Sequence, residues 1–173
     1  MIIPLKKIHW WQAVIQKLPA TRPGGWLFSR ILPPLDAWVS RRSEGRRNLT
    51  ALLSGLPIIT LTTRGARSGV PRHCHLVAIP DGARLALIAT NFGNKRHPSW
   101  VYNLRAHPEA LVAYEAASAV YQARPASEEE RVRYWVQGVA LYAGYAAYKP
   151  RVGARVIPIW VLEPVQEVAA FAG

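Results

Sequence analysis

The middle of the sequence alternates short apolar, β-branched runs with turns of glycine and proline. Strand-length runs occupy Pro57–Thr63, Pro71–Ile79 and Arg84–Thr90, and the turn sequence Pro80-Asp81-Gly82 separates the last two. Consecutive strands with short connections are usually neighbours in a sheet. This part of the chain is therefore predicted to form a three-stranded meander.

Helices and further strands are expected after the meander. His97-Pro98 predicts a helix that runs to about Ala106, with the proline in its first turn. A hairpin is expected from Ala110–Glu115 and Ala119–Arg124, and a last strand from Val156–Leu162. The order β-β-β-α-β-β-α-β suits an α+β fold, a closed barrel of about six mostly antiparallel strands with helices on its outside.

The helix between the hairpin and the last strand has a clear start. Ser127 and Glu130 have the spacing of a capping box, in which the serine binds a first-turn amide and the glutamate binds back to the serine N–H. Helical spacing then indicates which side chains should face inward: Val132, Trp135, Val136 and Val139.

The first 50 residues differ from the rest of the chain. Ile8–Leu18 has the pattern of a short amphipathic helix, and Pro19–Arg47 combines many prolines with tryptophan and arginine. The second segment is expected to form broken helical pieces that either pack onto the domain or lie at a membrane surface. We therefore divide the chain into an N-terminal helical segment, 1–50, and a barrel domain, 51–173.

The composition indicates which partners and which cellular compartment to expect. The chain has 22 Lys+Arg against 10 Asp+Glu, a formal charge of +12, which attracts nucleic acid, an anionic membrane or a multiply charged small molecule. Cys74 is the single cysteine, so no internal disulfide can form. The N-terminus lacks a secretory pattern. We expect a cytoplasmic protein, with contact at the inner face of the membrane if the N-terminal segment binds there.

The stretch Leu61–Arg72, LTTRGARSGVPR, places two glycines among arginines at the end of an apolar run. Gly65 and Gly69 can adopt positive φ, so the turn can bring backbone N–H groups close to a ligand. Arginines bind phosphate and carboxylate oxygens in a bidentate way. The stretch is interpreted either as an anion cradle or as a solvated hairpin loop.

A second basic loop, Asn91–Arg96, leaves a strand and ends where the helix near Pro98 begins. Lys95, Arg96 and the helix N-terminus together could bind another anionic group. The alternative is an ordinary solvated turn.

Three tyrosines, Tyr142, Tyr145 and Tyr148, recur at every third position. On one helix this spacing keeps the rings within about a 120° arc. They could wall an aromatic ligand and offer hydroxyl donors, or form a buried stripe.

Other chemistry finds little support in the sequence. His73 and His75 point to one face of a strand and Cys74 to the other, so no metal site is expected. His97 and His107 each precede a proline and are assigned to turn geometry. Neither a serine nucleophile elbow nor a G-x-G-x-x-G fingerprint is present.

The motifs LTTRGARSGVPR, NFGNKRHPSWVYNLRAHPEALV, LYAGYAAYKPR and RVIPIWVLEPV together resemble the deazaflavin-dependent nitroreductase family, which uses coenzyme F-420, an 8-hydroxy-5-deazaflavin. The resemblance covers about Thr50 to Val165, in the family's order. It implies a split β-barrel related to flavin-binding oxidases. It also implies an oxidoreductase that transfers hydride from the reduced deazaflavin to a nitro-compound, a quinone or another activated acceptor.

The resemblance also implies roles for particular residues. Tyr142, Tyr145 and Tyr148 match the tyrosine cluster on the substrate side, and Tyr145 is the first candidate donor to the reduced oxygen. The sequence departs from the family's usual residues at Ala66, at Val101 and at the pair His73 and His75. Ala66 leaves one contact to the cofactor tail unassigned, and the two histidines leave the wall of the pocket unassigned. The residues expected to bind the cofactor are Arg64, Gly65, Arg67, Ser68, Gly69, Arg72, Asn91, Gly93, Lys95, Arg96 and Trp100.

The positive charge fits coenzyme F-420 better than FMN, because the track offers more cations than one phosphate needs. The alternative function is a non-catalytic basic module that binds an anionic cofactor, nucleic acid or a membrane lipid. No nucleic-acid-binding module is recognisable, so a nucleic-acid partner is not expected. The expected partner is a small-molecule acceptor, and the oligomeric state is left open.

Overall fold

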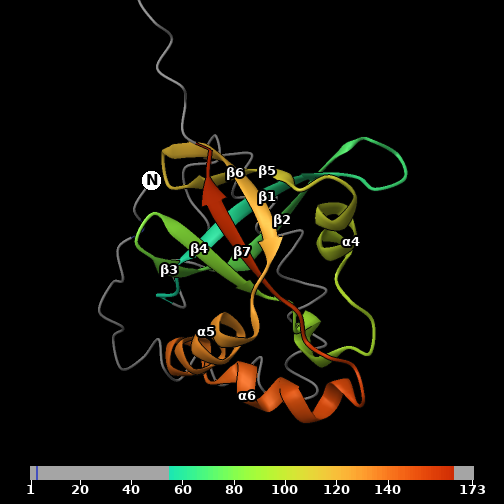
Figure 1. Ribbon diagram of the computed structural model, residues 1–173, viewed down its shortest axis with the longest axis vertical. Helices are drawn as coiled ribbons and strands as arrows, with labels where there is room; N and C mark the ends of the chain where they lie inside the picture. Colours follow the sequence, from blue (N-terminus) through green and yellow to red (C-terminus); the bar gives the residue numbers. More distant parts are fainter. Residues whose placement is uncertain (1–2, 4–54, 166–173) are drawn as a thin grey trace, which may run out of the picture.

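The computed structural model describes Ile3 and residues 55–165, which form one curled antiparallel sheet with helices around it (Figure 1). The seven strands are β1 (Ile58–Arg64), β2 (Pro71–Val77), β3 (Ile79–Asp81), β4 (Arg84–Ile88), β5 (Glu109–Tyr114), β6 (Ala117–Pro125) and β7 (Ile159–Pro164). The helices are α4 (Ser99–Ala106), α5 (Glu128–Leu141) and α6 (Gly144–Tyr148), with 3₁₀ turns η1 (Asn91–Gly93) and η2 (Lys149–Val152).

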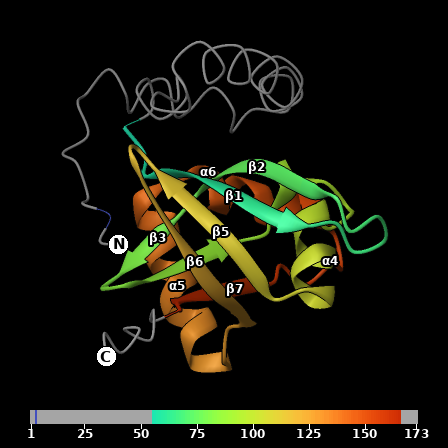
Figure 2. The same ribbon diagram turned by 90° about the horizontal axis from the view of Figure 1, so that it is seen from above.

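The strand order, β2-β1-β5-β6-β7-β4-β3, makes the sheet close on itself. Its two edge strands, β2 and β3, follow one another in the chain and are separated only by Ala78. The Ala78 N–H donates to the Pro57 carbonyl at 2.9 Å, which extends the β1–β2 ladder by one residue before the chain enters β3. The chain therefore passes at this residue from one edge of the sheet to the other. Figure 2 shows the curled sheet from above. This confirms the split-barrel α+β fold.

Side chains alternate between two cores along the strands, as a period of two requires. On β7, Trp160 and Leu162 belong to the first core, while Ile159 and Val161 belong to the second. Side chains of α4 complete the first core, and those of α5 and α6 complete the second. The helical layer of α5 and α6 lies on one side of the barrel, apart from α4 (Figure 1).

The capping box at the start of α5 is confirmed. Ser127 Oγ accepts from the Glu130 N–H at 3.2 Å, and the Glu130 carboxylate accepts from the Ser127 N–H at 2.8 Å. The Arg124 guanidinium also donates to both Glu130 oxygens, at 2.7 and 2.8 Å. These hydrogen bonds, those of Arg124 foremost, lower the pKa of Glu130 to about 2. The start of α5 is thereby fixed to β6.

Several local predictions were wrong. The meander is confirmed only in part. The first two predicted strands pair as β1 and β2, and Ile79 pairs with the third predicted strand as part of β3, but β2 itself does not pair with β4, whose other neighbour is β7. The expected strand Pro71–Ile79 breaks at Ala78, which gives seven strands in place of about six. The predicted hairpin of β5 and β6 is confirmed. The helix before this hairpin, α4, begins at Ser99, with Pro98 as its N-cap and not in its first turn.

The inward face of α5 was also misassigned. Val132 and Val136 are 62% and 63% exposed, and Trp135 and Val139 are only partly buried. The buried positions are Tyr134 and Gly138. The helix is therefore rotated relative to its apolar pattern. The expected N-terminal helices and the division at residue 50 lie outside the described residues and stay predictions.

Candidate functional site

The β1–β2 turn folds around its own glycines. The Gly65 N–H donates to the Val70 carbonyl at 3.0 Å, and the Gly69 N–H donates to the Gly65 carbonyl at 2.8 Å. Gly69 has a φ of 67°, and a Cβ at Gly65 would lie only 2.6 Å from Ser68 Oγ. Both glycine amides are therefore used within the turn, so they are not available to cradle an anion as the sequence predicted.

Asn103 connects this turn to α4. Its side chain is 7% exposed, its Oδ1 accepts from the Ala66 N–H at 3.0 Å, and its Nδ2 donates to Thr63 Oγ1 at 3.0 Å. A buried amide that satisfies a loop amide and a strand hydroxyl holds the turn in one place. Sequence reasoning missed this residue, because a single asparagine within an amphipathic helix carries no distinguishing signal.

The η1 loop continues from β4 to the start of α4. Asn91, Phe92 and Gly93 have φ values of 51°, 55° and 81°, so three consecutive residues are left-handed. Asn91 Nδ2 donates to the Arg96 carbonyl at 3.0 Å, and Asn94 Nδ2 donates to the Asn91 carbonyl at 2.8 Å. A Cβ at Gly93 would lie 2.9 Å from Arg151 Cβ, which explains the need for glycine where the loop touches η2.

Five exposed cations lie on the β1–β2 turn and on the η1 loop, the two segments that adjoin α4. They form no ion pair among the described residues, whose ion pairs use other arginines, those of β4, β6 and α5. Cations without carboxylate partners remain free to bind an anionic ligand. On the turn these are Arg64, Arg67 and Arg72, and on the η1 loop they are Lys95 and Arg96.

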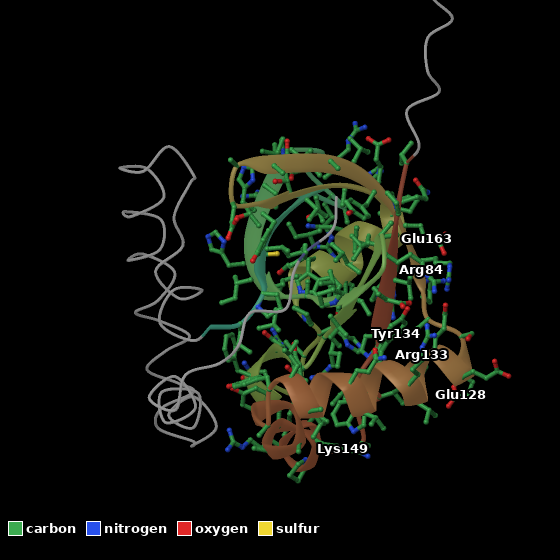
Figure 3. All side chains as sticks on the ribbon, turned by 90° about the vertical axis from the view of Figure 1, so that its left-hand side faces the viewer. Arg84, Glu128, Arg133, Tyr134, Lys149 and Glu163 are labelled. Atoms are coloured by element: carbon green, nitrogen blue, oxygen red, sulfur yellow. The ribbon has the colours of Figure 1, made fainter. Side chains whose placement is uncertain are left out.

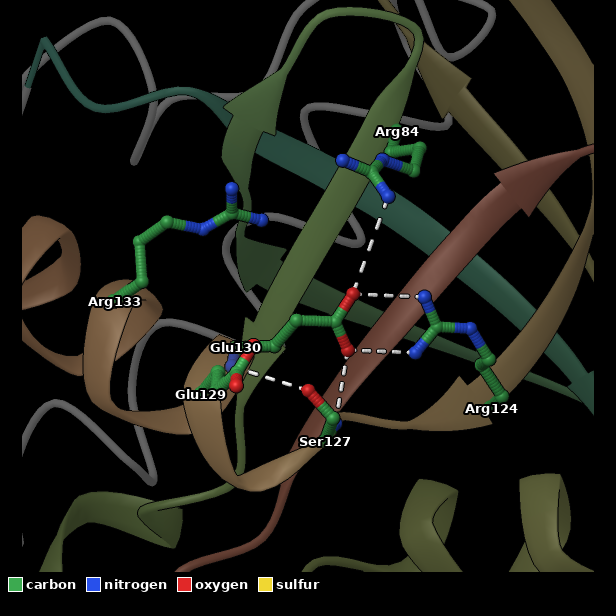
Figure 4. A pocket seen from close by; sticks show the side chains of 6 residues that line it. All are labelled: Arg84, Arg124, Ser127, Glu129, Glu130 and Arg133. Atoms are coloured by element: carbon green, nitrogen blue, oxygen red, sulfur yellow. Dashed lines mark hydrogen bonds and ion pairs between the residues drawn. The ribbon is translucent and has the colours of Figure 1, made fainter.

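The arginines beside α5 are, by contrast, already neutralised. An open pocket of about 600 Å³ is lined by Arg84, Arg124, Ser127, Glu129, Glu130 and Arg133 (Figure 4). Arg124 pairs with Glu130 and Glu163, and Asp81 pairs with Arg84 and Arg133. Figure 3 shows Arg84, Arg133, Tyr134 and Glu163 above α5, with Lys149 below the helical layer. The ion pairs that line this pocket link α5 to the sheet.

The three tyrosines meet, although not on one helix. Tyr142 is the extended C-cap of α5, with φ −145° and ψ 103°, whereas Tyr145 and Tyr148 belong to α6. Tyr142 packs edge-on against Tyr145 at 5.4 Å between ring centroids, and the Tyr142 and Tyr148 hydroxyls lie 2.9 Å apart. The three tyrosines therefore lie together as predicted, but they do not lie on one helix, so that part of the prediction is wrong.

The environment of the tyrosines keeps them protonated. All three side chains are at most 8% exposed, and burial raises the pKa of each phenol. For Tyr148, the hydrogen bond with Tyr142 and the nearby Arg151 guanidinium, 5.5 Å from the ring centroid, counteract this rise in pKa. A protonated phenol can donate a hydrogen bond to a developing negative charge.

The η1 loop meets the tyrosine cluster. The Phe92 ring lies edge-on to the Tyr148 ring at 6.1 Å between centroids, and Gly93 touches Arg151. The structure therefore brings the second basic loop next to the tyrosines, while α4 and Asn103 join that loop to the first turn. Trp100, 5% exposed, is buried in the first core beside the loop, where its side chain packs.

The remaining candidates are separate from this arrangement. Thr60 and Thr62 hydroxyls pair with the Nδ1 atoms of His75 and His73, at 3.1 and 2.8 Å. Cys74 points to the opposite face toward the Leu61 carbonyl, and burial raises its pKa to about 12. Among residues 55–165 no three His, Cys, Asp or Glu side chains gather as a metal site would require. No described helix is long and apolar enough to span a membrane.

Comparison with known proteins decides the family. The profile of the family described as F420H(2)-dependent quinone reductase matches residues 35–164. The chain belongs to this family. It is therefore an oxidoreductase whose cofactor is coenzyme F-420, and the alternative of a non-catalytic binding module is set aside.

Individual relatives agree with this assignment. An F420H(2)-dependent quinone reductase of Mycobacterium tuberculosis is 28% identical over 109 residues, covering 61% of this chain and 72% of the relative. A solved F420-H2 dependent reductase is 33% identical with a TM-score of 0.57, covering 62% of this chain and 94% of that one. A structure described as a domain-swapped dimer is 29% identical with a TM-score of 0.60, covering 82% and 99%.

Proposed function

We propose that this chain reduces quinones, with the reduced deazaflavin held between the β1–β2 turn and the η1 loop and the acceptor beside the tyrosine cluster. The observation that carries the proposal is the division of the cations. Arg64, Arg67, Arg72, Lys95 and Arg96 are exposed and free of ion pairs among the described residues, whereas the arginines beside α5 are neutralised.

The residues present fit this cofactor. Its phosphate and polyglutamate tail need an extended series of cations, and the turn and the loop, which both adjoin α4, supply one. Gly93 permits the close approach of the η1 loop to η2, which a Cβ would prevent. When bound, the reduced deazaflavin supplies a hydride, and the acceptor also needs a proton to become a hydroquinone.

The chain's own residues bind, orient and donate. The arginines and Lys95 hold the anionic tail, and the η1 loop fixes the cofactor end of the site. Tyr145 is the proposed donor to the acceptor oxygen, because its hydroxyl makes no hydrogen bond to any described residue while Tyr142 and Tyr148 bond to each other. Burial keeps the phenol protonated and excludes water from the reacting atoms.

Nitro-compounds are a second acceptor class that the same arrangement could reduce. A nitro group, like a quinone carbonyl, gains negative charge on oxygen when it accepts hydride, so one phenol donor could serve both. Comparing kcat/KM for a benzoquinone and a nitroaromatic ring of similar size distinguishes the two. We expect the quinone to be preferred, and a clear preference for the nitro-compound would contradict this.

The binding proposal is tested by titrating oxidised coenzyme F-420 against three single variants. Arg67→Ala and Arg72→Ala each remove a free cation, and Arg131→Ala removes a paired one from α5 as the matched control. We expect the first two to weaken binding about tenfold or more, by roughly 1.5–3 kcal/mol each, with a smaller dependence on salt. Unchanged affinity in both would contradict the proposed cofactor track.

A further inference from the structure

Arg155 lies between η2 and β7, and its guanidinium binds four acceptors around the η1 loop. Nη1 donates to the Ala89 carbonyl at 3.0 Å and to His97 Nδ1 at 3.2 Å. Nη2 donates to the Thr90 carbonyl at 2.8 Å and to the Asn94 carbonyl at 2.9 Å. These acceptors lie before, within and after the loop, so one side chain fixes both of its ends.

The loop that Arg155 holds has an unfavourable backbone conformation. Asn91 and Phe92 are non-glycine residues with φ of 51° and 55°. Residues with a side chain rarely adopt this conformation, and it persists only where surrounding contacts impose it. Within the loop, the Gly93 N–H donates to the Thr90 carbonyl and the Asn94 N–H donates to the Asn91 carbonyl, at 3.1 and 2.9 Å, beside the two side-chain bonds of Asn91 and Asn94.

The conformation of the η1 loop determines where its two cations and its aromatic ring lie. Lys95 and Arg96 are exposed on it without ion pairs among the described residues, and Phe92 contacts Tyr148. We propose that Arg155 is a positioning residue that presets the η1 loop for the deazaflavin before the cofactor arrives. This inference rests on the proposed function, because it assumes that the η1 loop binds the cofactor.

A lysine cannot replace this arginine. The planar guanidinium directs its two terminal nitrogens toward acceptors on two sides, whereas an ammonium has three donors at a single point. His97 must also accept at Nδ1, which places its proton on Nε2. Arg155→Lys keeps the positive charge and most of the side-chain volume but loses the four-acceptor geometry, so it separates positioning from charge.

The first measurement is hydrogen exchange at the amides of Gly93 and Asn94 in the protein without cofactor. The variants are Arg155→Lys and Arg155→Ala, and Arg131→Lys on α5 is the control. We expect both Arg155 variants to lose protection at these amides by tenfold or more, while amides in β1 and β5 stay protected. Unchanged protection in both Arg155 variants would overturn the inference. Loss of protection across the whole barrel would also overturn it, since it would indicate a general structural role.

The second measurement is the affinity for oxidised coenzyme F-420 together with steady-state turnover. We expect the cofactor Kd of Arg155→Lys to rise at least tenfold, with kcat at saturating cofactor within about threefold of the parent. A fall in kcat with unchanged Kd would overturn the positioning role. If the parent protein fails to bind the deazaflavin, the proposed function fails, and the exchange experiment still decides whether Arg155 holds the loop.

Discussion

The hydroxyls of Tyr142 and Tyr148 lie 2.9 Å apart, although one residue ends α5 and the other ends α6. They meet because the chain leaves the helical conformation at Tyr142 and resumes it two residues later. The turn is possible because Gly144 has no side chain, since a Cβ there would collide with the Tyr142 ring. Tyr142 and Tyr148 bond to each other, whereas the Tyr145 hydroxyl makes no hydrogen bond to a described residue.

Replacing Tyr145 with phenylalanine tests its role as a donor. The ring keeps its packing against Tyr142, so cofactor affinity should hold while quinone reduction slows by about 100- to 1,000-fold. The measurement is single-turnover oxidation of the reduced deazaflavin by a quinone, with Tyr142→Phe and Tyr148→Phe alongside. If all three variants match the parent rate, the cluster is a packing stripe and the assignment is wrong.

Replacing Gly144 with alanine tests the packing of the cluster. In an ordinary helix this change should stabilise by up to about 1 kcal/mol. Here the added methyl must displace the Tyr142 ring, and we expect a loss of about 1–3 kcal/mol in the free energy of unfolding. Denaturant unfolding measures the change, and a stabilised variant would show that the ring moves aside without cost.

Replacing Asn103 with alanine removes two hydrogen bonds from a buried position. The Ala66 N–H and the Thr63 hydroxyl lose their partner, so we expect a cost of about 1–3 kcal/mol in stability and weaker binding of coenzyme F-420. Arg105→Ala, at an exposed position on the same helix, is the control. If affinity for the cofactor stays at the parent value in the folded variant, Asn103 supports the fold alone.

The His97 imidazole should make the folded protein sensitive to acid. Burial, followed by the charges of Arg155 and Arg105, lowers its pKa below the ordinary 6.5. The unfolded chain therefore binds more protons than the folded one as the pH falls below about 6.5, so stability decreases there. His97→Gln keeps an acceptor for Arg155 without titrating.

Urea unfolding between pH 8 and 5 compares the parent with His97→Gln. The other histidines are present in both proteins, so the difference between the two curves reports on His97. We expect the variant to lose less stability on acidification, and parallel curves would contradict the assignment.

Local signals predicted much of the fold, and their failures have physical causes. The capping box and the β5–β6 hairpin depend on neighbouring residues, so the sequence indicated them correctly. The pairing of β4 with β7 joins distant segments, and no local pattern around Arg84 could indicate it. Val132 and Val136 follow an apolar period, yet α5 is oriented by Gly138, where a Cβ would collide with Ile88, and by the Tyr134–Asp81 hydrogen bond.

In the candidate site, too, the sequence indicated local features but not contacts between residues far apart in the chain. Glycine and arginine side by side in the turn, and tyrosines at every third residue, are visible along the chain. Asn103 and Arg155 act on backbone groups remote in sequence, Ala66 in one case and Ala89 to Asn94 in the other. A single polar residue gives no hint of such a target, so only the structure could reveal these two contacts.

The position of β7 between β6 and β4 has a consequence for the order of folding. During synthesis, β4 and β6 emerge well before the strand that pairs with both of them. Until β7 emerges, each of these strands has an edge without its final partner, and such edges invite pairing with other chains. Barrel closure must therefore be a late event, and chains that stop before Ile159 should aggregate rather than accumulate as soluble intermediates.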